Sequence, residues 1–225
     1  MTNKYMYFVA NWKMFGDLRT LNTLNKVIHF KNRVKKNKFR LIYCPPSTLI
    51  CPLSKMFKKT SIEVGAQNCH ESENYGAYTG QLNPRMIKGV GAKYVILGHS
   101  ENRQSGESDK LINLKIKSAI KSDLKIIFCV GETLSEKRKK ITKKILAKQI
   151  IKGLDKIKKR KDILIAYEPV WAIGSGLIPK QSELFETIDY IKSKVKGAKI
   201  LYGGSVNSKN INNLKNINNI DGFLI

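Results

Sequence analysis

The sequence contains few acidic residues for its size. Asp and Glu total 17 against 42 Lys and Arg, which leaves a formal net charge of +25. Such a charge attracts nucleic acid, anionic membranes and phosphorylated metabolites. The basic blocks Lys35-Lys36, Lys58-Lys59 and Lys137-Arg138-Lys139-Lys140 lack the interleaved aromatic residues of single-strand binding surfaces. We therefore expect most lysines to lie on solvated faces, with polyanion binding as the alternative.

Cysteine motifs are also missing. The chain has four cysteines, and none of them belongs to a CxxC pair: Cys44, Cys51, Cys69 and Cys129. They lie in or beside apolar runs, which disfavours both a metal site and a disulfide framework. We expect reduced, mostly buried thiols and no metal ligands.

Long apolar runs are absent as well. None approaches the length of about 18 residues that a membrane span requires, and no apolar stretch of signal-peptide length follows Met1-Thr2-Asn3-Lys4. No Gly-x-Gly-x-x-Gly follows the first apolar run and no Walker sequence occurs, which disfavours a nucleotide-binding doubly wound sheet. The 225 residues, 42% of them hydrophobic, suffice for one sizeable core. We predict a cytoplasmic enzyme with a single domain, residues 1–225.

Short apolar runs recur along the chain and are candidate strands. They cover 5–10, 39–43, 62–66, 93–97, 125–130, 163–167, 199–202 and 222–225. Three intervening segments carry apolar residues at helical spacing: Leu18, Leu21, Leu24 and Ile28; Ile112, Ile116, Ala119 and Ile120; Leu184, Ile188, Ile191 and Val195. Asn83 before Pro84, and Ser182, are candidate N-caps. Strands without a polar face that alternate with helices predict an α/β fold with a helix-covered parallel sheet, and eight such units favour a closed (β/α)₈ barrel.

The segment after the sixth run combines an acid with a glycine-rich loop. Pro169 holds Glu168 in an extended conformation. The loop that follows mixes apolar Val170, Trp171 and Ile173 with Gly174 and Gly176. A loop of this composition can close over a ligand, exclude water and offer backbone N–H groups to an anion. A Glu-Pro pair alone is more often a solvated strand end, so this pattern needs support from elsewhere.

Other polar residues also follow candidate strands. They are Asn11 and Lys13 after the first run, His99 and Glu101 after the fourth, Glu132 after the fifth, and Gly203-Gly204-Ser205 after the seventh. In a (β/α)₈ barrel all these positions open onto one face, where the chemistry takes place. The sequence thus predicts that an amine, an imidazole, a carboxylate and an N–H-rich turn meet at one mouth.

Four segments resemble the signatures of one enzyme family. Residues 166–176 closely resemble the flexible sixth loop of the triosephosphate isomerases. Asn11-Trp12-Lys13-Met14, Gly98-His99-Ser100-Glu101 and Tyr202-Gly203-Gly204-Ser205 match the family's other signatures in the same order, and the resemblance spans residues 5–225. It implies a TIM-barrel isomerase that interconverts dihydroxyacetone phosphate and D-glyceraldehyde 3-phosphate through an enediolate, in glycolysis and gluconeogenesis. No metal or redox cofactor is implied.

The resemblance also implies roles for individual residues. Glu168 would be the base, His99 a neutral electrophile and Lys13 the cation beside the oxyanion and the phosphate, assignments taken from the family. Asn11, Gly174 and Ser205 would also bind the substrate. The supporting roles are an ion pair between Glu101 and Lys13, a place for Glu132 beside Trp171, and hydrogen bonds from Tyr202 and Ser205 to the closed lid.

Some features depart from the family. The loop Asn74–Gln81 resembles one that inserts into a neighbouring subunit, which implies a homodimer. However, Gln81 and Asn102 stand where the family often has an ion pair, and we expect a hydrogen bond to replace it. Pro179 should stiffen the far hinge of the lid.

The chain ends at Ile225, before the family's Gly-Gly pair and last helix. At the level of sequence this suggests a C-terminally incomplete barrel, lacking the segment after strand eight, with weak phosphate binding and reduced stability. A rival hypothesis is an inactive barrel whose basic surface binds nucleic acid. Neither specific nucleic-acid binding nor a membrane partner is our preferred prediction.

Overall fold

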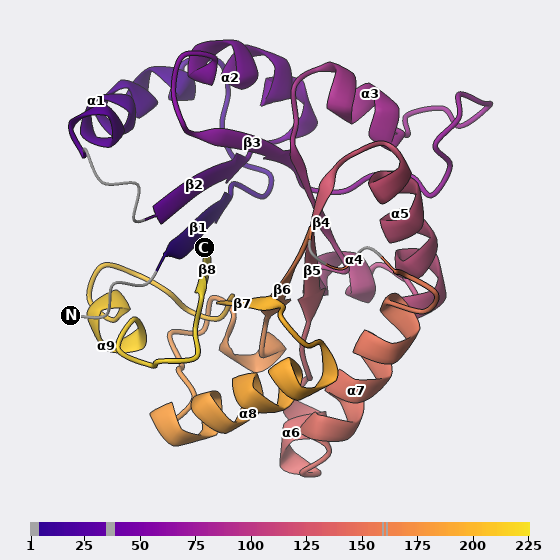
Figure 1. Cartoon of the computed structure of the whole chain (residues 1–225), viewed down its shortest axis with the longest axis vertical. Coiled ribbons are helices and arrows are strands. Elements are labelled where there is room, and N and C mark those ends of the chain that lie inside the picture. Colours follow the sequence, from indigo (N-terminus) through magenta and orange to yellow (C-terminus); the bar gives the residue numbers. More distant parts are fainter. Residues whose placement is uncertain (1–4, 35–38, 159, 161) are drawn as a thin grey trace.

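The chain forms a closed barrel of eight parallel strands (Figure 1). The structure, a computed structural model, describes residues 5–34, 39–158, 160 and 162–225. The segment Met1-Thr2-Asn3-Lys4 and the basic pair Lys35-Lys36 lie outside these ranges. Strands pair in sequence order, and β1 (Met6–Asn11) closes the barrel against β8 (Gly222–Leu224), with Tyr7 opposite Gly222. This confirms the predicted TIM-barrel fold.

All eight apolar runs form strands, each within one residue of the predicted bounds. Besides β1 and β8 they are β2 (Phe39–Cys44), β3 (Glu63–Ala66), β4 (Tyr94–Leu97), β5 (Lys125–Val130), β6 (Ile163–Tyr167) and β7 (Lys199–Tyr202). Their alternating side chains fill two layers of core. Val9, Ile42, Ile96, Ile127 and Leu201 are among those that fill the barrel interior, whereas residues such as Val95, Ile126 and Ile165 pack outward against helices.

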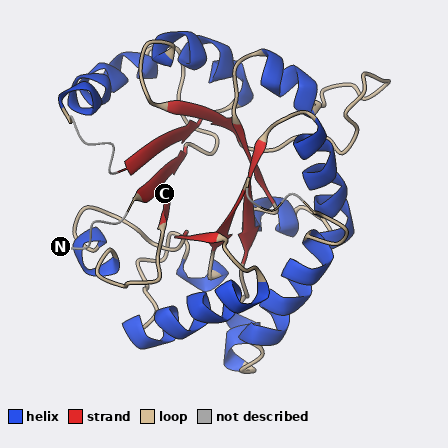
Figure 2. Cartoon of the chain, in the orientation of Figure 1, coloured by secondary structure: helices blue, strands red, loops and turns tan. Residues whose placement is uncertain are grey.

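Helices surround the barrel on its outside (Figure 2). The α-helices are α1 (Asn25–Arg33), α2 (Ile50–Phe57), α3 (Pro84–Gly89), α4 (Ser100–Gln104), α5 (Asp109–Lys121), α6 (Leu134–Arg138), α7 (Thr142–Gly153), α8 (Gln181–Lys194) and α9 (Ile211–Leu214). Short 3₁₀ turns are η1 (Thr20–Leu24), η2 (Ser47–Leu49) and η3 (Val170–Ala172). Within the described ranges, no helix has both the length and the apolarity needed to cross a bilayer.

Two details of the helix predictions are wrong. Asn83 caps α3 as predicted, because its side chain accepts a hydrogen bond from the Met86 N–H. Ser182, in contrast, lies inside α8, which begins at Gln181 after the extended Lys180. Leu18 is exposed and precedes η1, because the chain there forms a five-residue 3₁₀ segment in place of the first part of the expected α-helix.

The expected hydrogen bond between Gln81 and Asn102 is also not formed in the part of the chain that the structure describes. Gln81 is exposed in the loop before α3, whereas Asn102 lies half-buried on α4. The four cysteines are unpaired; Cys44, Cys69 and Cys129 are buried and Cys51 is partly buried. Burial raises the pKa of Cys69 to about 12, so its thiol stays protonated at neutral pH.

Candidate active site

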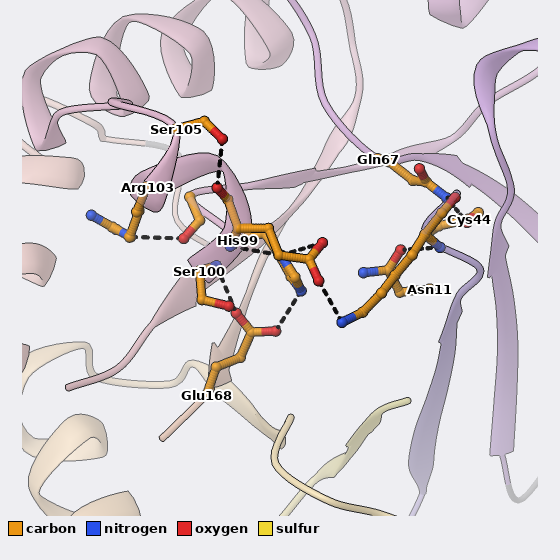
Figure 3. Close-up of polar contacts among 11 residues, drawn as sticks. Asn11, Cys44, Gln67, His99, Ser100, Arg103, Ser105 and Glu168 are labelled. Carbon is orange, nitrogen blue, oxygen red and sulfur yellow. Dashed lines mark hydrogen bonds and ion pairs between the residues drawn. The ribbon is translucent and has the colours of Figure 1, made fainter. Parts of the chain in front are cut away.

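The Glu168 carboxylate lies buried at the end of β6, only 2% exposed. Its Oε1 lies 3.2 Å from His99 Nε2, and its Oε2 accepts a hydrogen bond of 3.4 Å from the Ser100 N–H (Figure 3). Gly203, just after β7, leaves room for it: a Cβ at that position would come within 2.8 Å of Glu168 Cγ. The buried charge is therefore matched by donors from the β4 end, as a carboxylate in such a site requires.

His99 is held in one ring orientation. It follows β4, is 5% exposed, and its Nδ1 accepts a hydrogen bond of 3.3 Å from the Glu101 N–H. A ring that accepts at Nδ1 carries its proton on Nε2, the nitrogen that faces Glu168. The neutral ring can thus present an N–H to a ligand oxygen, which an electrophile at this position needs.

The protonation of His99 depends on its partner. Burial lowers the pKa of His99, but the hydrogen bond and charge of Glu168, with the charge of Glu101, outweigh it and raise that pKa above its ordinary 6.5. If Glu168 turns toward a ligand, the hydrogen bond and charge that raise the pKa of His99 most leave with it, whereas burial and Lys13, which lower that pKa, and Glu101, which raises it, remain. Movement of the carboxylate therefore favours the neutral form of His99.

Lys13 has a strained backbone that its neighbours hold in place. Its φ of +49° lies in the left-handed region, which is costly for a residue with a side chain. The Lys13 N–H donates to Asn11 Oδ1 at 3.1 Å, and Gln67 Nε2 donates to the Lys13 carbonyl at 2.8 Å. Lys13 Nζ lies 2.6 Å from Glu101 Oε1, the expected ion pair. These contacts fix where the ammonium group can reach.

The loop after β6 lies against the loop after β7. Gly176 N–H donates to Ser205 Oγ at 3.1 Å, and Ser205 Oγ donates to the Ala172 carbonyl at 2.6 Å. The Ser205 N–H also donates to Ala172, at 3.0 Å, so in this loop position it is already used and is not free for a phosphate. Trp171 Nε1 donates to Glu132 Oε1 at 2.9 Å, as expected.

The expected hydrogen bond from Tyr202 to the lid is absent from this structure. The Tyr202 hydroxyl is buried and has no partner among the described residues. The lid contacts the seventh loop through Ser205, and Tyr202 is packed beneath Gly204. The role predicted for Tyr202 concerns the closed lid and stays a prediction, while the hydrogen bond between Ser205 and the lid is present in this structure.

A cavity of about 390 Å³ opens between these groups. Its walls include every residue predicted to act on or bind a substrate: Asn11, Lys13, His99, Glu168, Gly174 and Ser205. The four supporting residues, Glu101, Glu132, Trp171 and Tyr202, do not line it and contact those that do, or pack behind them. The volume lies in the range of small-molecule sites.

Sequence reasoning missed two residues that shape the site. Gln67 follows β3 and joins the Lys13 carbonyl to the Cys44 carbonyl. Arg103 donates from Nε to the Gly98 carbonyl and from Nη2 to the Cys129 carbonyl, which fixes the turn that carries His99. The position of Gln67 directly after a strand was a usable signal; Arg103 lies within α4, and its role depends on tertiary contacts.

The fold and this cavity together define a (β/α)₈-barrel enzyme of small-molecule metabolism, with a carboxylate and an imidazole side by side at the strand ends. Residues 6–225 match the family model described as triosephosphate isomerase. The chain belongs to the triosephosphate isomerase family. It interconverts dihydroxyacetone phosphate and D-glyceraldehyde 3-phosphate, an aldose–ketose isomerisation of glycolysis and gluconeogenesis. The rival hypothesis of an inactive barrel is therefore set aside.

Individual relatives agree over nearly the whole chain. The triosephosphate isomerase of Alkaliphilus oremlandii is 37% identical over 228 residues, covering 96% of this chain and 91% of the relative. That of Clostridium botulinum is 39% identical with the same coverage. The crystal structure of triosephosphate isomerase from Bartonella henselae superposes with a TM-score of 0.88 at 31% identity, covering 98% of this chain and 92% of that one.

Proposed function

We propose that Glu168, His99 and Lys13 carry out the isomerisation and that Asn11, Gly174 and Ser205 bind the substrate. The observation that supports this is the single cavity of about 390 Å³ whose walls hold all six residues. Glu168 takes a proton from C1 of dihydroxyacetone phosphate, while His99 Nε2–H gives its proton to the carbonyl oxygen at C2. Removal of the C1 proton gives an enediolate whose negative charge lies beside the Lys13 ammonium, and transfer of the His99 proton to the C2 oxygen then gives the neutral enediol and leaves that charge on the His99 ring.

The second half of the isomerisation returns both protons. Glu168, now protonated, gives its proton to C2, and His99 Nε2 takes the proton from the C1 hydroxyl, which leaves an aldehyde at C1 and restores both side chains. Gly174 and Ser205 hold the phosphate through their backbone. For Ser205 this requires that the Ala172 carbonyl moves away from its N–H. Residues 169–176, three of which wall the cavity here, exclude water from the enediolate when they cover the bound substrate.

Deuterium from solvent should appear in the product. When the purified chain converts dihydroxyacetone phosphate in D₂O, the proton held by Glu168 can exchange, so glyceraldehyde 3-phosphate should carry deuterium at C2. Product trapped by immediate oxidation and analysed by mass spectrometry gives the measurement. A Glu168→Gln variant serves as the background. Product that contains hydrogen only would leave the transfer without an exchangeable proton, as in a direct hydride shift, and would contradict the proposed exchange at Glu168.

We also propose that the chain is one domain that works as a homodimer in the cytoplasm. The loop Asn74–Gln81 projects from the barrel (Figure 1), and its Tyr75 and Tyr78 are 75% and 51% exposed. Met14 and Phe15, after β1, are 94% and 75% exposed. Large apolar side chains gathered in protruding loops commonly mark protein interfaces. A partner's loop would cover Met14 and Phe15 beside the active site.

Charges placed in these loops should separate the subunits. We expect wild-type protein at micromolar concentration to sediment as a dimer and the Phe15→Lys, Tyr75→Lys double variant as a monomer. Phe185→Lys, at a partly exposed position on α8, is the matched control and should remain dimeric. Sedimentation of the wild type as a monomer alone would contradict the proposed dimer.

A further inference from the structure

The lid tryptophan is held on two sides. Glu132 Oε1 accepts from its indole N–H at the ring edge, and Lys137 Nζ lies 3.8 Å from the ring centroid, over its face. Glu132 is itself 1% exposed and accepts from the Tyr167 hydroxyl, so it is fixed to the barrel. A cation centred so closely over an indole is the most favourable geometry for a cation–π contact. Trp171 is therefore held by a carboxylate at its ring edge and by an ammonium group over its ring face.

Lys137 also reaches a second element. Its Nζ lies 3.1 Å from Glu183 Oε2 in the first turn of α8. The helix that carries it, α6, starts with a capping box in which Thr133 and Glu136 satisfy each other's backbone N–H groups. Lys137 thus projects from a fixed turn and joins three segments, α6, the lid and α8, by a single charge.

We propose that Lys137 is a positioning residue that holds the lid where Ile173, Gly174 and Gly176 wall the substrate cavity. The inference rests on the proposed role of residues 169–176 as a lid. Those three residues line the cavity in the structure in which Trp171 is clamped. When the lid opens, Trp171 moves away from the Lys137 ammonium. The contact therefore stabilises the covering position of the lid and increases the residence time of the bound triose phosphate.

Replacement of Lys137 by Gln should weaken substrate binding more than it slows the proton-transfer steps. Loss of a partly buried cation–π contact corresponds to about a five- to tenfold change in the lid equilibrium. We expect KM to rise by about that factor with kcat changed less than about twofold, because the lid opens more often while Glu168 and His99 are untouched. Lys137→Arg keeps a cation over the ring and should restore the wild-type KM.

Two further variants separate the contacts. Glu183→Gln removes the ion pair with α8 but leaves the ammonium over Trp171, so its KM should stay near that of the wild type. Lys139→Gln removes the exposed charge of a neighbouring lysine on the same turn. This variant controls for the change in net charge. A Glu183→Gln variant that reproduces the rise in KM would assign the effect to the α8 ion pair and overturn the proposal.

Fluorine NMR provides a readout that does not need turnover. The chain has two tryptophans, so fluorotryptophan labelling gives two signals, and Trp12→Phe assigns them. With glycerol 3-phosphate, which has the phosphate but no carbonyl, the Trp171 signal should exchange faster in Lys137→Gln than in the wild type. Unchanged exchange, or an unchanged or lower KM, overturns the proposal. If the Trp171 signal of the wild type does not respond to glycerol 3-phosphate, the proposed lid fails instead, whereas a response in the wild type with unchanged exchange in Lys137→Gln overturns only the role of Lys137.

Discussion

Glu168→Asp is expected to lower kcat by about two to four orders of magnitude while KM changes little. The substitution keeps the carboxylate but withdraws it by one methylene from the cavity that it lines. A general base works only within hydrogen-bond reach of the proton it removes, and a displacement of about 1 Å can cost a hundredfold in rate. The phosphate and Lys13 contacts stay in place, so binding should be nearly unaffected.

The measurement is a coupled assay of glyceraldehyde 3-phosphate formation, with the folded fraction checked by thermal unfolding. Glu186→Asp, the same change on the exposed face of α8, is the control and should leave kcat unaltered. A Glu168→Asp enzyme within tenfold of wild-type kcat would show that the base is another group. The thermal transition shows whether the Glu168→Asp variant is folded, so a loss of activity caused by unfolding can be told apart from a loss of the base.

The sequence predicted the barrel and the meeting of its site residues for a physical reason. Strands buried on both faces give continuous apolar runs, and parallel strands bring all their carboxyl ends to one side. Lys13, His99 and Glu168 could therefore be placed together despite their distance along the chain. The predicted helix from Leu18 failed because apolar spacing alone does not separate a 3₁₀ turn from an α-helix, as η1 shows.

Other contacts, formed only in the folded chain and matched by no family signature, could not be predicted. The positive φ of Lys13 is held by Asn11 and Gln67, and a sequence gives no sign of a strained lysine. Composition also does not show that Ser205, and not Tyr202, contacts the lid in this structure. The contact of Lys137 with Trp171 joins residues 34 positions apart and is invisible among 42 basic residues.

His99→Gln is expected to lower kcat by about two to three orders of magnitude. The amide can still donate a hydrogen bond from the position of Nε2, but it cannot give its proton to the carbonyl oxygen and recover one from the C1 hydroxyl. Deuterium exchange at C1 should fall in parallel, because Glu168 cannot remove the C1 proton without support for the oxyanion. Retention of more than a tenth of wild-type kcat would contradict the role of electrophile.

The same variant should change the pH profile. In the ligand-free site Glu168 raises the pKa of His99 above 6.5, so the imidazolium–carboxylate pair accumulates as pH falls. Charged His99 holds the base away from the substrate, and kcat/KM of the wild type should therefore fall with an acid midpoint above 6.5. The fall in kcat/KM at low pH should be absent in the His99→Gln variant.

Stability should follow the opposite trend to activity. A histidine whose folded pKa is raised contributes stability that is complete below its unfolded pKa and is lost as pH rises through the folded value. The wild type should therefore exceed His99→Gln in stability by more at about pH 6 than at about pH 9. Denaturant unfolding at the two pH values gives the difference. A gap that widens toward high pH would mean that His99 is neutral beside Glu168 even without substrate, and the carboxylate would then need no proton transfer before it acts.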